Sequence, residues 1–269
     1  MRAALEAVRQ WVYQPTLLEE LPVRDLSTPH RSRRLLTGRG TRYRNLTVLM
    51  QSEASLPLRL ALVGMSGAGK SFWTKRLAAE GWTSICCDDG IERTLAPWLA
   101  AGGYSGIDGV AAWMGWPDSA NYAQREAQYL EEEIHTLGEA LTSLDQRSEK
   151  PLVLDTTGSV IYTGNNLLLR LRRRMTVVYL AASAEEQQLL IERYLSDPKP
   201  VLWRGAFQPR PGESPKETVV RCYPTLISAR RQSYEALAHC TLKVAELRDP
   251  AFDVAAFLGK IRGQLERGR

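Results

Sequence analysis

The sequence predicts a three-layer α/β/α domain built on a five-stranded parallel sheet. From residue 58 onward, short apolar runs alternate with longer segments of helical period, which is the pattern of strand–helix units in a parallel sheet. The chain has 269 residues, 44% of them hydrophobic and 24% charged, so it is long enough to bury a substantial core. This composition excludes a fibrous chain and argues against a disordered one.

The predicted elements alternate along the chain. Each strand is a short apolar run, and we expect strands at 58–64, 82–87, 151–155, 175–181 and 240–245. The segments between them have helical period, and we expect helices at 70–80, from about 90, at about 119–144, at 165–174, at 184–195, at about 218–239 and at about 250–267. A glycine-rich segment near 101–109 interrupts the helical pattern before the longest helix.

Residues 1–57 differ from the rest and are expected to form a basic N-terminal extension of the domain at 58–269. They contain nine arginines against five acids, which accounts for nearly all of the net charge of +5. Two interpretations remain open: an element that docks a partner or a second copy, and a helix with an extended segment packed on the domain. Nucleic-acid binding is disfavoured, because basic and aromatic residues are not interleaved and no nucleic-acid-binding motif is visible.

The remaining composition points to a reduced, non-membrane environment. No apolar stretch approaches the roughly 18 residues that a membrane span needs, and the first segment lacks the apolar block of a signal peptide. The expected location is the cytoplasm. The four cysteines have neither a disulfide framework nor zinc-ligand spacing, so we expect free and mostly buried thiols.

The run GMSGAGKS at 64–71 matches the phosphate-binding pattern G-x-x-x-x-G-K-[ST] and stands between a predicted strand and a predicted helix. Its glycines let backbone N–H groups point at phosphates, and the following helix adds the positive end of its dipole. Lys70 is expected to bridge the β- and γ-phosphates, and Ser71 to ligate Mg²⁺. We therefore expect ATP and Mg²⁺ as cofactors. The expected nucleotide-binding residues are Gly64, Ser66, Gly67, Ala68, Gly69, Lys70 and Ser71.

Carboxylates follow two other predicted strands. Asp88 and Asp89 follow the second strand and Asp155 ends the third, so all three should lie at the carboxyl edge of the sheet, where open α/β sheets bind ligands. Asp88 could orient an acceptor hydroxyl or take its proton, and Asp155 occupies a position typical of a magnesium-associated carboxylate. The competing interpretation is that these residues cap helices or form turns.

The long segment 197–217 contains five prolines among several basic residues, so it cannot form one helix or a central strand. Loops of this length are usually functional or disordered. We expect a lid that closes over bound ATP, excludes water and brings Lys199 or Arg204 to the transferring phosphoryl group.

Several of these motifs together resemble the shikimate kinase family of P-loop small-molecule kinases. The resemblance covers residues from about 58 to 267. The matching segments are GMSGAGKS, the run Asp88-Asp89-Gly90-Ile91-Glu92, Thr157-Gly158-Ser159-Val160, VVYLAAS, the Lys199-Pro200 opening of the lid, and Arg230 with Tyr234. The resemblance implies a kinase in which Asp88 contacts the acceptor hydroxyl, Thr157 and Gly158 line the acceptor pocket, and Arg230 holds a substrate carboxylate.

The chain also departs from the family pattern. Cys86 replaces a metal-associated Asp, for which Asp155 could compensate, and Lys199 replaces the lid Arg. The glycine-rich segment is Thr156-Thr157-Gly158 here. The aromatic-Arg-x-x-Glu motif matches Tyr122, Ala123 and Glu126, so a carboxylate-binding Arg is missing, although Arg125 is near. An insertion carrying Trp113, Trp116 and Tyr122 is expected either to lie over the acceptor site or simply to pack.

The first functional interpretation is an ATP-dependent kinase acting on a hydroxyl of a small polar, anionic metabolite. Its catalytic residues are Lys70, Asp88 and Lys199, its substrate-binding residues are Asp88, Thr157, Gly158 and Arg230, and its metal ligands are Ser71 and Asp155. The alternative is an ATP-binding protein of the same fold that has lost catalysis and acts in regulation or interaction. An NTPase associated with nucleic acid through the basic extension is the third and weakest interpretation.

Overall fold

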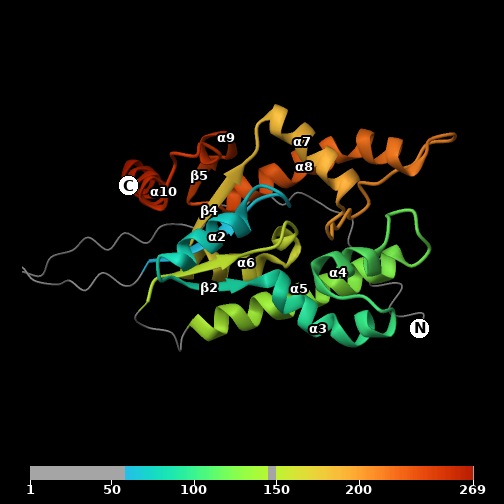
Figure 1. The fold of residues 1–269 in the computed structure, drawn as a ribbon, viewed down its shortest axis with the longest axis horizontal. Helices are drawn as coiled ribbons and strands as arrows, with labels where there is room; N and C mark the ends of the chain where they lie inside the picture. Colours follow the sequence, from blue (N-terminus) through green and yellow to red (C-terminus); the bar gives the residue numbers. More distant parts are fainter. Residues whose placement is uncertain (1–57, 145–149, 269) are drawn as a thin grey trace, which may run out of the picture. The chain divides into compact units, whose positions relative to one another are not determined.

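The computed structural model describes residues 58–144 and 150–268 (Figure 1). Residues 1–57 lie outside the described part of the chain, and so do both interpretations of the basic extension. The described residues contain one sheet with helices on both of its sides.

The sheet has five strands in the order β2-β3-β1-β4-β5, and every neighbouring pair is parallel. This confirms the predicted sheet. The connection after β1 leads to β2, on one side of β1, and the connection after β3 leads to β4, on the other side. The strand order therefore reverses between β1 and β3. Ligands of open α/β sheets bind at such a reversal, beyond the carboxyl ends of the strands. The strands are β1 (Arg59–Val63), β2 (Thr83–Cys86), β3 (Leu152–Asp155), β4 (Thr176–Ala181) and β5 (Cys240–Lys243).

Helices cover both faces of this sheet. Along β1, Leu60 and Leu62 pack with Trp73, whereas Ala61 and Val63 belong to the opposite, larger core. This alternation follows from the two-residue period of a strand, and it confirms the three-layer prediction. The helices are α2 (Lys70–Ala79), α3 (Cys87–Ala101), α4 (Gly106–Met114), α5 (Tyr122–Ser143), η2 (Val160–Tyr162), α6 (Asn165–Arg174), α7 (Ala184–Ser196), α8 (Pro215–Leu237), α9 (Val244–Leu247) and α10 (Val254–Arg267).

Several element boundaries differ from the prediction, and three of these differences concern the site. α3 begins at Cys87, so Asp88 and Asp89 lie in its first turn and neither is the N-cap, which is Cys86. α4 forms within and just after the glycine-rich segment that was expected to be irregular. α8 begins at Pro215, because Ser214 and Glu217 form a capping box that fixes its start. The irregular segment predicted at 197–217, called the lid below, is therefore shorter than predicted and ends at residue 214.

Two expectations from composition can be compared with the described residues. All four cysteines are free, and three of them are buried, as expected. Among residues 58–144 and 150–268, no helix combines the length and the apolar content needed to cross a bilayer.

Candidate active site

The phosphate-binding loop joins β1 to α2, and its glycines are needed for its shape. Gly64, Gly67 and Gly69 have φ values of 146°, 80° and 97°, a region that side chains rarely adopt. A Cβ on Gly64 would also lie 2.8 Å from the Leu180 carbonyl oxygen. The Lys70 Nζ folds back and donates to the carbonyl oxygens of Gly64 and Met65, at 3.0 and 3.1 Å. Burial lowers the pKa of Lys70, and the nearby Asp155 and Asp88 carboxyls oppose that shift.

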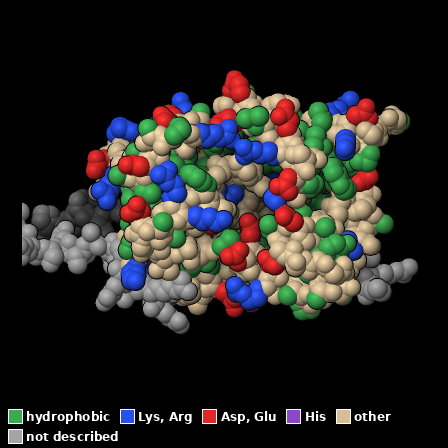
Figure 2. All heavy atoms as spheres, in the orientation of Figure 1, with side chains coloured by type: hydrophobic (Ala, Val, Ile, Leu, Met, Phe, Trp, Pro, Cys, Tyr) green, Lys and Arg blue, Asp and Glu red, His purple; other side chains and the backbone are tan. Residues whose placement is uncertain are grey.

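A cavity of about 480 Å³ lies over this loop. It brings together predicted residues from four separate segments, namely the phosphate loop, α3, the segment after β3, and the lid. The predicted residues that line it are Ser66, Gly67, Lys70, Ser71, Asp88, Gly158 and Lys199. Thr157, Asp155, Arg230 and Arg204 do not line it. Figure 2 shows the molecular surface hollowed near the middle of the view, with basic and acidic side chains around the hollow.

Asp155 lies beneath the cavity, at the end of β3, and is 2% exposed. Burial raises the pKa of this carboxyl, while Lys70 and a hydrogen bond from the Ser71 hydroxyl lower it. Its Oδ1 is buried without a hydrogen-bond partner in the described residues. Mg²⁺ is usually held by one or two carboxylates together with substrate phosphates. A buried carboxylate with a free oxygen beside Ser71 therefore fits the expected ion.

Asp88 projects from the first turn of α3 into the cavity. Its pKa is raised to about 6, mainly by burial and to a smaller extent by the Asp155 and Asp89 charges, while the Lys70 charge opposes the shift. The Tyr129 hydroxyl of α5 donates to Asp88 Oδ1 over 3.5 Å. Asp88 thus combines access to the cavity with a pKa close to neutrality, which suits a residue that accepts a proton.

Glu133 of α5 is a buried carboxylate that the sequence analysis did not identify. The hydroxyls of Thr157 and Ser159 both donate to it, the second at 2.7 Å. Burial raises its pKa to about 7. The Thr157 hydroxyl is therefore turned toward Glu133 and away from the cavity, so Thr157 does not have the expected position in the pocket lining.

One sequence signal could have located Glu133. The aromatic-x-x-x-Glu spacing found at Tyr122 and Glu126 recurs two helical turns later, at Tyr129 and Glu133. Tyr129 of the second copy lines the cavity, and Leu130 occupies its Arg position. The first copy, to which the sequence analysis assigned the motif, contacts the lid.

The Tyr122–Glu126 pair holds the lid backbone. The Tyr122 hydroxyl donates to the Val201 carbonyl oxygen at 2.6 Å and accepts from the Trp203 N–H at 3.1 Å. Glu126 Oε1 accepts from the Arg204 N–H at 2.9 Å. Trp203 itself is 1% exposed. The middle of the lid is therefore packed into the domain, although its sequence shows no regular pattern.

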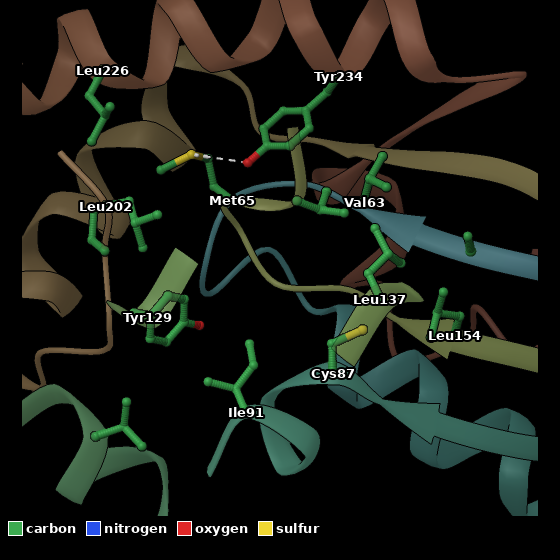
Figure 3. Close-up of a cluster of buried hydrophobic side chains, with 14 of the residues drawn as sticks. Val63, Met65, Cys87, Ile91, Tyr129, Leu137, Leu154, Leu202, Leu226 and Tyr234 are labelled. Atoms are coloured by element: carbon green, nitrogen blue, oxygen red, sulfur yellow. Dashed lines mark hydrogen bonds between the residues drawn. The ribbon is translucent and has the colours of Figure 1, made fainter. Parts of the chain in front are cut away.

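Hydrophobic contacts hold the lid as well. Trp203 packs edge-on against Tyr194, Phe207 and Tyr223. Figure 3 shows Leu202 beside Met65 of the phosphate loop and Tyr129 of α5, within one buried cluster. These contacts connect the lid to two of the segments that line the cavity, the phosphate loop and α5.

The aromatic insertion is divided between the two expected roles. Ile107 of α4 lines the cavity, so part of the insertion does reach the site. Trp113 and Trp116 do not line it. Trp113 lies under the Arg125 guanidinium, and Trp116 packs edge-on against Tyr194, so these two residues have the packing role.

Arg230 lies outside the cavity lining and is 1% exposed. Its guanidinium donates to the carbonyl oxygens of Gly158 and Leu202, at 2.7 and 2.5 Å. In this structure Arg230 therefore bridges the lid and the segment after β3. Lys199 does line the cavity, where the carboxylates of Asp108 and Asp197 hold its ammonium group.

Comparisons with solved structures find similar folds. A shikimate kinase from Acinetobacter baumannii in complex with shikimate is 24% identical, with a TM-score of 0.49 over 79% of this chain and 94% of that one. A shikimate kinase from Aquifex aeolicus is 17% identical, with a TM-score of 0.49 over 77% and 97%. A gluconokinase from Sinorhizobium meliloti 1021 is 18% identical, with a TM-score of 0.39 over 78% and 93%.

In sequence, no family model and no curated protein matches the chain. The three solved structures are each below 25% identical and below a TM-score of 0.5, so nothing about the acceptor of this chain follows from them. The chemistry of the site rests on the residues that form the cavity.

Proposed function

We propose that this protein is an ATP-dependent phosphotransferase that moves the γ-phosphate to a hydroxyl group of a small molecule. The observation that supports this most is the convergence of Lys70 and Asp88 on one cavity, with Ser71 and Asp155 beside them. A nucleotide-binding site alone has no need of a second carboxylate opposite the phosphate loop. A kinase needs one to orient the attacking hydroxyl.

At the nucleotide end, the loop N–H groups and the start of α2 bind the phosphates. Lys70 leaves the Gly64 and Met65 carbonyls and turns its ammonium group to the β- and γ-phosphates. Ser71 and Asp155 would hold Mg²⁺, and the bound ion would neutralise charge on the phosphates. These groups lower the barrier by positioning and by electrostatic stabilisation, without forming a covalent bond to the protein.

At the acceptor end, Asp88 orients the hydroxyl and takes its proton. The acceptor oxygen forms a bond to the γ-phosphorus, the bond between that phosphorus and the β,γ-bridging oxygen breaks, and ADP leaves. With a pKa of about 6, most Asp88 carboxyls are ionised at pH 7 and can serve as the base. Tyr129 keeps the carboxylate in place through its hydrogen bond.

The lid forms the remaining wall of the cavity through Asp197, Lys199 and Pro200. Lys199 supplies a positive charge near the phosphate end. Exclusion of water by the docked lid favours transfer to the acceptor over hydrolysis.

Nucleotide binding tests the first half of the proposal. Mg-ATP should raise the melting temperature of the full chain, and Lys70→Ala should lose most of that shift, because a ligand stabilises only the state that binds it. Lys75→Ala is the matched control, since Lys75 is an exposed lysine of the same helix that does not line the cavity. Equal shifts in the Lys70→Ala variant and the wild type would contradict the proposed role of the loop.

A further inference from the structure

We infer that the hydroxyl acceptor is an uncharged polyhydroxylated molecule, such as a sugar, polyol or cyclitol, and that the site discriminates against carboxylates and other anions. The inference rests on the proposed function and specifies its acceptor class. It follows from how the positive and negative charges around the cavity are already paired.

The cations lining the cavity lie at its phosphate end or are already paired. Among the described lining residues these cations are Lys70, Arg193 and Lys199. Lys70 belongs to the phosphate loop, and Arg193 donates to the Gly67 carbonyl oxygen of the same loop at 3.3 Å. Lys199 contacts the carboxylates of Asp108 and Asp197. The positive charges of these three side chains therefore lie at the phosphate loop or are paired with carboxylates at the lid.

Arg230 carries the guanidinium that would be expected to recognise an acceptor anion. In this structure its guanidinium contacts other groups of the protein. Two of its donors bind the Gly158 and Leu202 carbonyls, and its guanidinium lies 5.3 Å from the centre of the Tyr162 ring. Nε is buried without a partner, but Arg230 is absent from the cavity lining. The charge of Arg230 also partly opposes the rise in the pKa of Glu133.

We take the part of the cavity around Asp88 as its acceptor end, because Asp88 is the residue proposed to orient the hydroxyl. Besides Asp88, the cavity lining includes the uncharged residues Ile107, Tyr129 and Gly158. Asp88 must be ionised to accept a proton, so an anionic acceptor beside it would meet a like charge in a poorly solvated space. A neutral polyol avoids this repulsion, and its hydroxyls can donate to Asp88 and exchange hydrogen bonds with Tyr129.

Matched pairs of probes test the inference on the full chain. The pairs differ in one charge: methyl shikimate against shikimate, glucitol against gluconate, and glucose against glucuronate, within a wider set of sugars, polyols and cyclitols with their carboxylate counterparts. Affinity is measured by calorimetry with Mg²⁺ and a non-hydrolysable ATP analogue present. We expect the molecules that bind to be neutral, and their carboxylate partners to bind at least about tenfold more weakly.

A variant with an added cation provides a second, independent readout. Ile107→Lys places a positive charge in the cavity wall, with Ile107→Met as the control that keeps the residue apolar. The lysine should improve the relative affinity for the carboxylate member of a pair by about tenfold, and the methionine should not.

The inference is overturned if a carboxylate binds as well as its neutral partner or better, or if no neutral member of the set binds. Failure of the proposed function gives a different result. In that case neutral probes bind with the expected preference, but no ADP forms when ATP replaces the analogue.

Discussion

Asp88 and Glu133 are both carboxyl groups with raised pKa values, and their surroundings give them different roles. Asp88 faces the cavity, whereas Glu133 is buried behind it and accepts from the Thr157 and Ser159 hydroxyls. Asp88 is therefore placed to contact the acceptor. Glu133 acts through its neighbours, because it positions the segment after β3.

Asp88→Asn tests the assigned base. The amide has the same shape but cannot take the proton, so kcat should fall by roughly 10² to 10⁴ while Mg-nucleotide affinity stays close to that of the wild type. In the wild type, kcat/KM should rise with pH through about 6, the pKa of the ionising carboxyl. An Asp88→Asn variant with wild-type kcat would remove Asp88 from the mechanism.

Glu133→Gln tests the cost of burying a carboxyl group. Its pKa rises from 4.5 to about 7 on folding, so its contribution to stability is fully present below about pH 4.5 and is lost as the pH rises through about 7. The Glu133→Gln variant has no carboxyl group to ionise at this position, so it does not lose stability in this way as the pH rises. It should exceed the wild type in unfolding free energy at pH 8, by up to about 3 kcal/mol, and the difference should vanish near pH 4.5.

Denaturant unfolding at the two pH values measures this difference for Glu133→Gln. Glu139→Gln is the control, because Glu139 is an exposed glutamate of the same helix, with a side chain that is 71% exposed. A difference between Glu133→Gln and the wild type that does not change with pH would contradict the raised pKa.

Among the elements, the lid depends most on contacts that are distant in sequence. Tyr122 bridges two of its backbone groups from α5, and Arg230 binds a third from α8. Removal of the Tyr122 hydroxyl leaves the buried Val201 carbonyl and the Trp203 N–H without this partner, which costs about 1 to 3 kcal/mol of local stability. The lid should then open more often.

Trypsin cleavage after Arg204 measures lid opening, because Lys199 and Arg210 are each followed by proline and are poor sites. Cleavage of Tyr122→Phe should be several-fold faster than that of the wild type, and a Mg-bound ATP analogue should slow it in the wild type. Tyr104→Phe, at a position 39% exposed, is the control. Equal cleavage with and without the analogue would refute ligand-linked closure.

Local patterns predict the strands and most helices well, because apolar runs and helical periods are read within one segment. α4 was missed because its glycines favour loops locally, while burial of Val110, Trp113 and Met114 stabilises the helix. Local sequence patterns are limited in the same way for the site, because they do not show which distant segments come together. The phosphate loop is contiguous and was predicted, but the Glu133–Thr157 contact and the docking of Tyr122 on the lid join distant segments and required the fold.

In the whole molecule, residues from 58 onward contain every segment that lines the cavity. A chain beginning at Ser55 should therefore keep its fold and its Mg-ATP-induced shift in melting temperature. Circular dichroism and thermal melts of the two chains measure this. Loss of nucleotide binding on removal of the basic extension would contradict the prediction, whereas a changed oligomeric state would support a docking role for it.

Phosphoryl transfer from ATP to a small-molecule hydroxyl can be measured directly as ADP formation. The assay uses the purified full chain with Mg-ATP, with and without each acceptor of the matched set, and with Lys70→Ala as the blank. We expect acceptor-dependent ADP, together with a phosphorylated product of the same acceptor, and both should vanish in the blank. Tight Mg-ATP binding without ADP formation for any acceptor would contradict phosphoryl transfer and favour a catalytically silent nucleotide-binding protein.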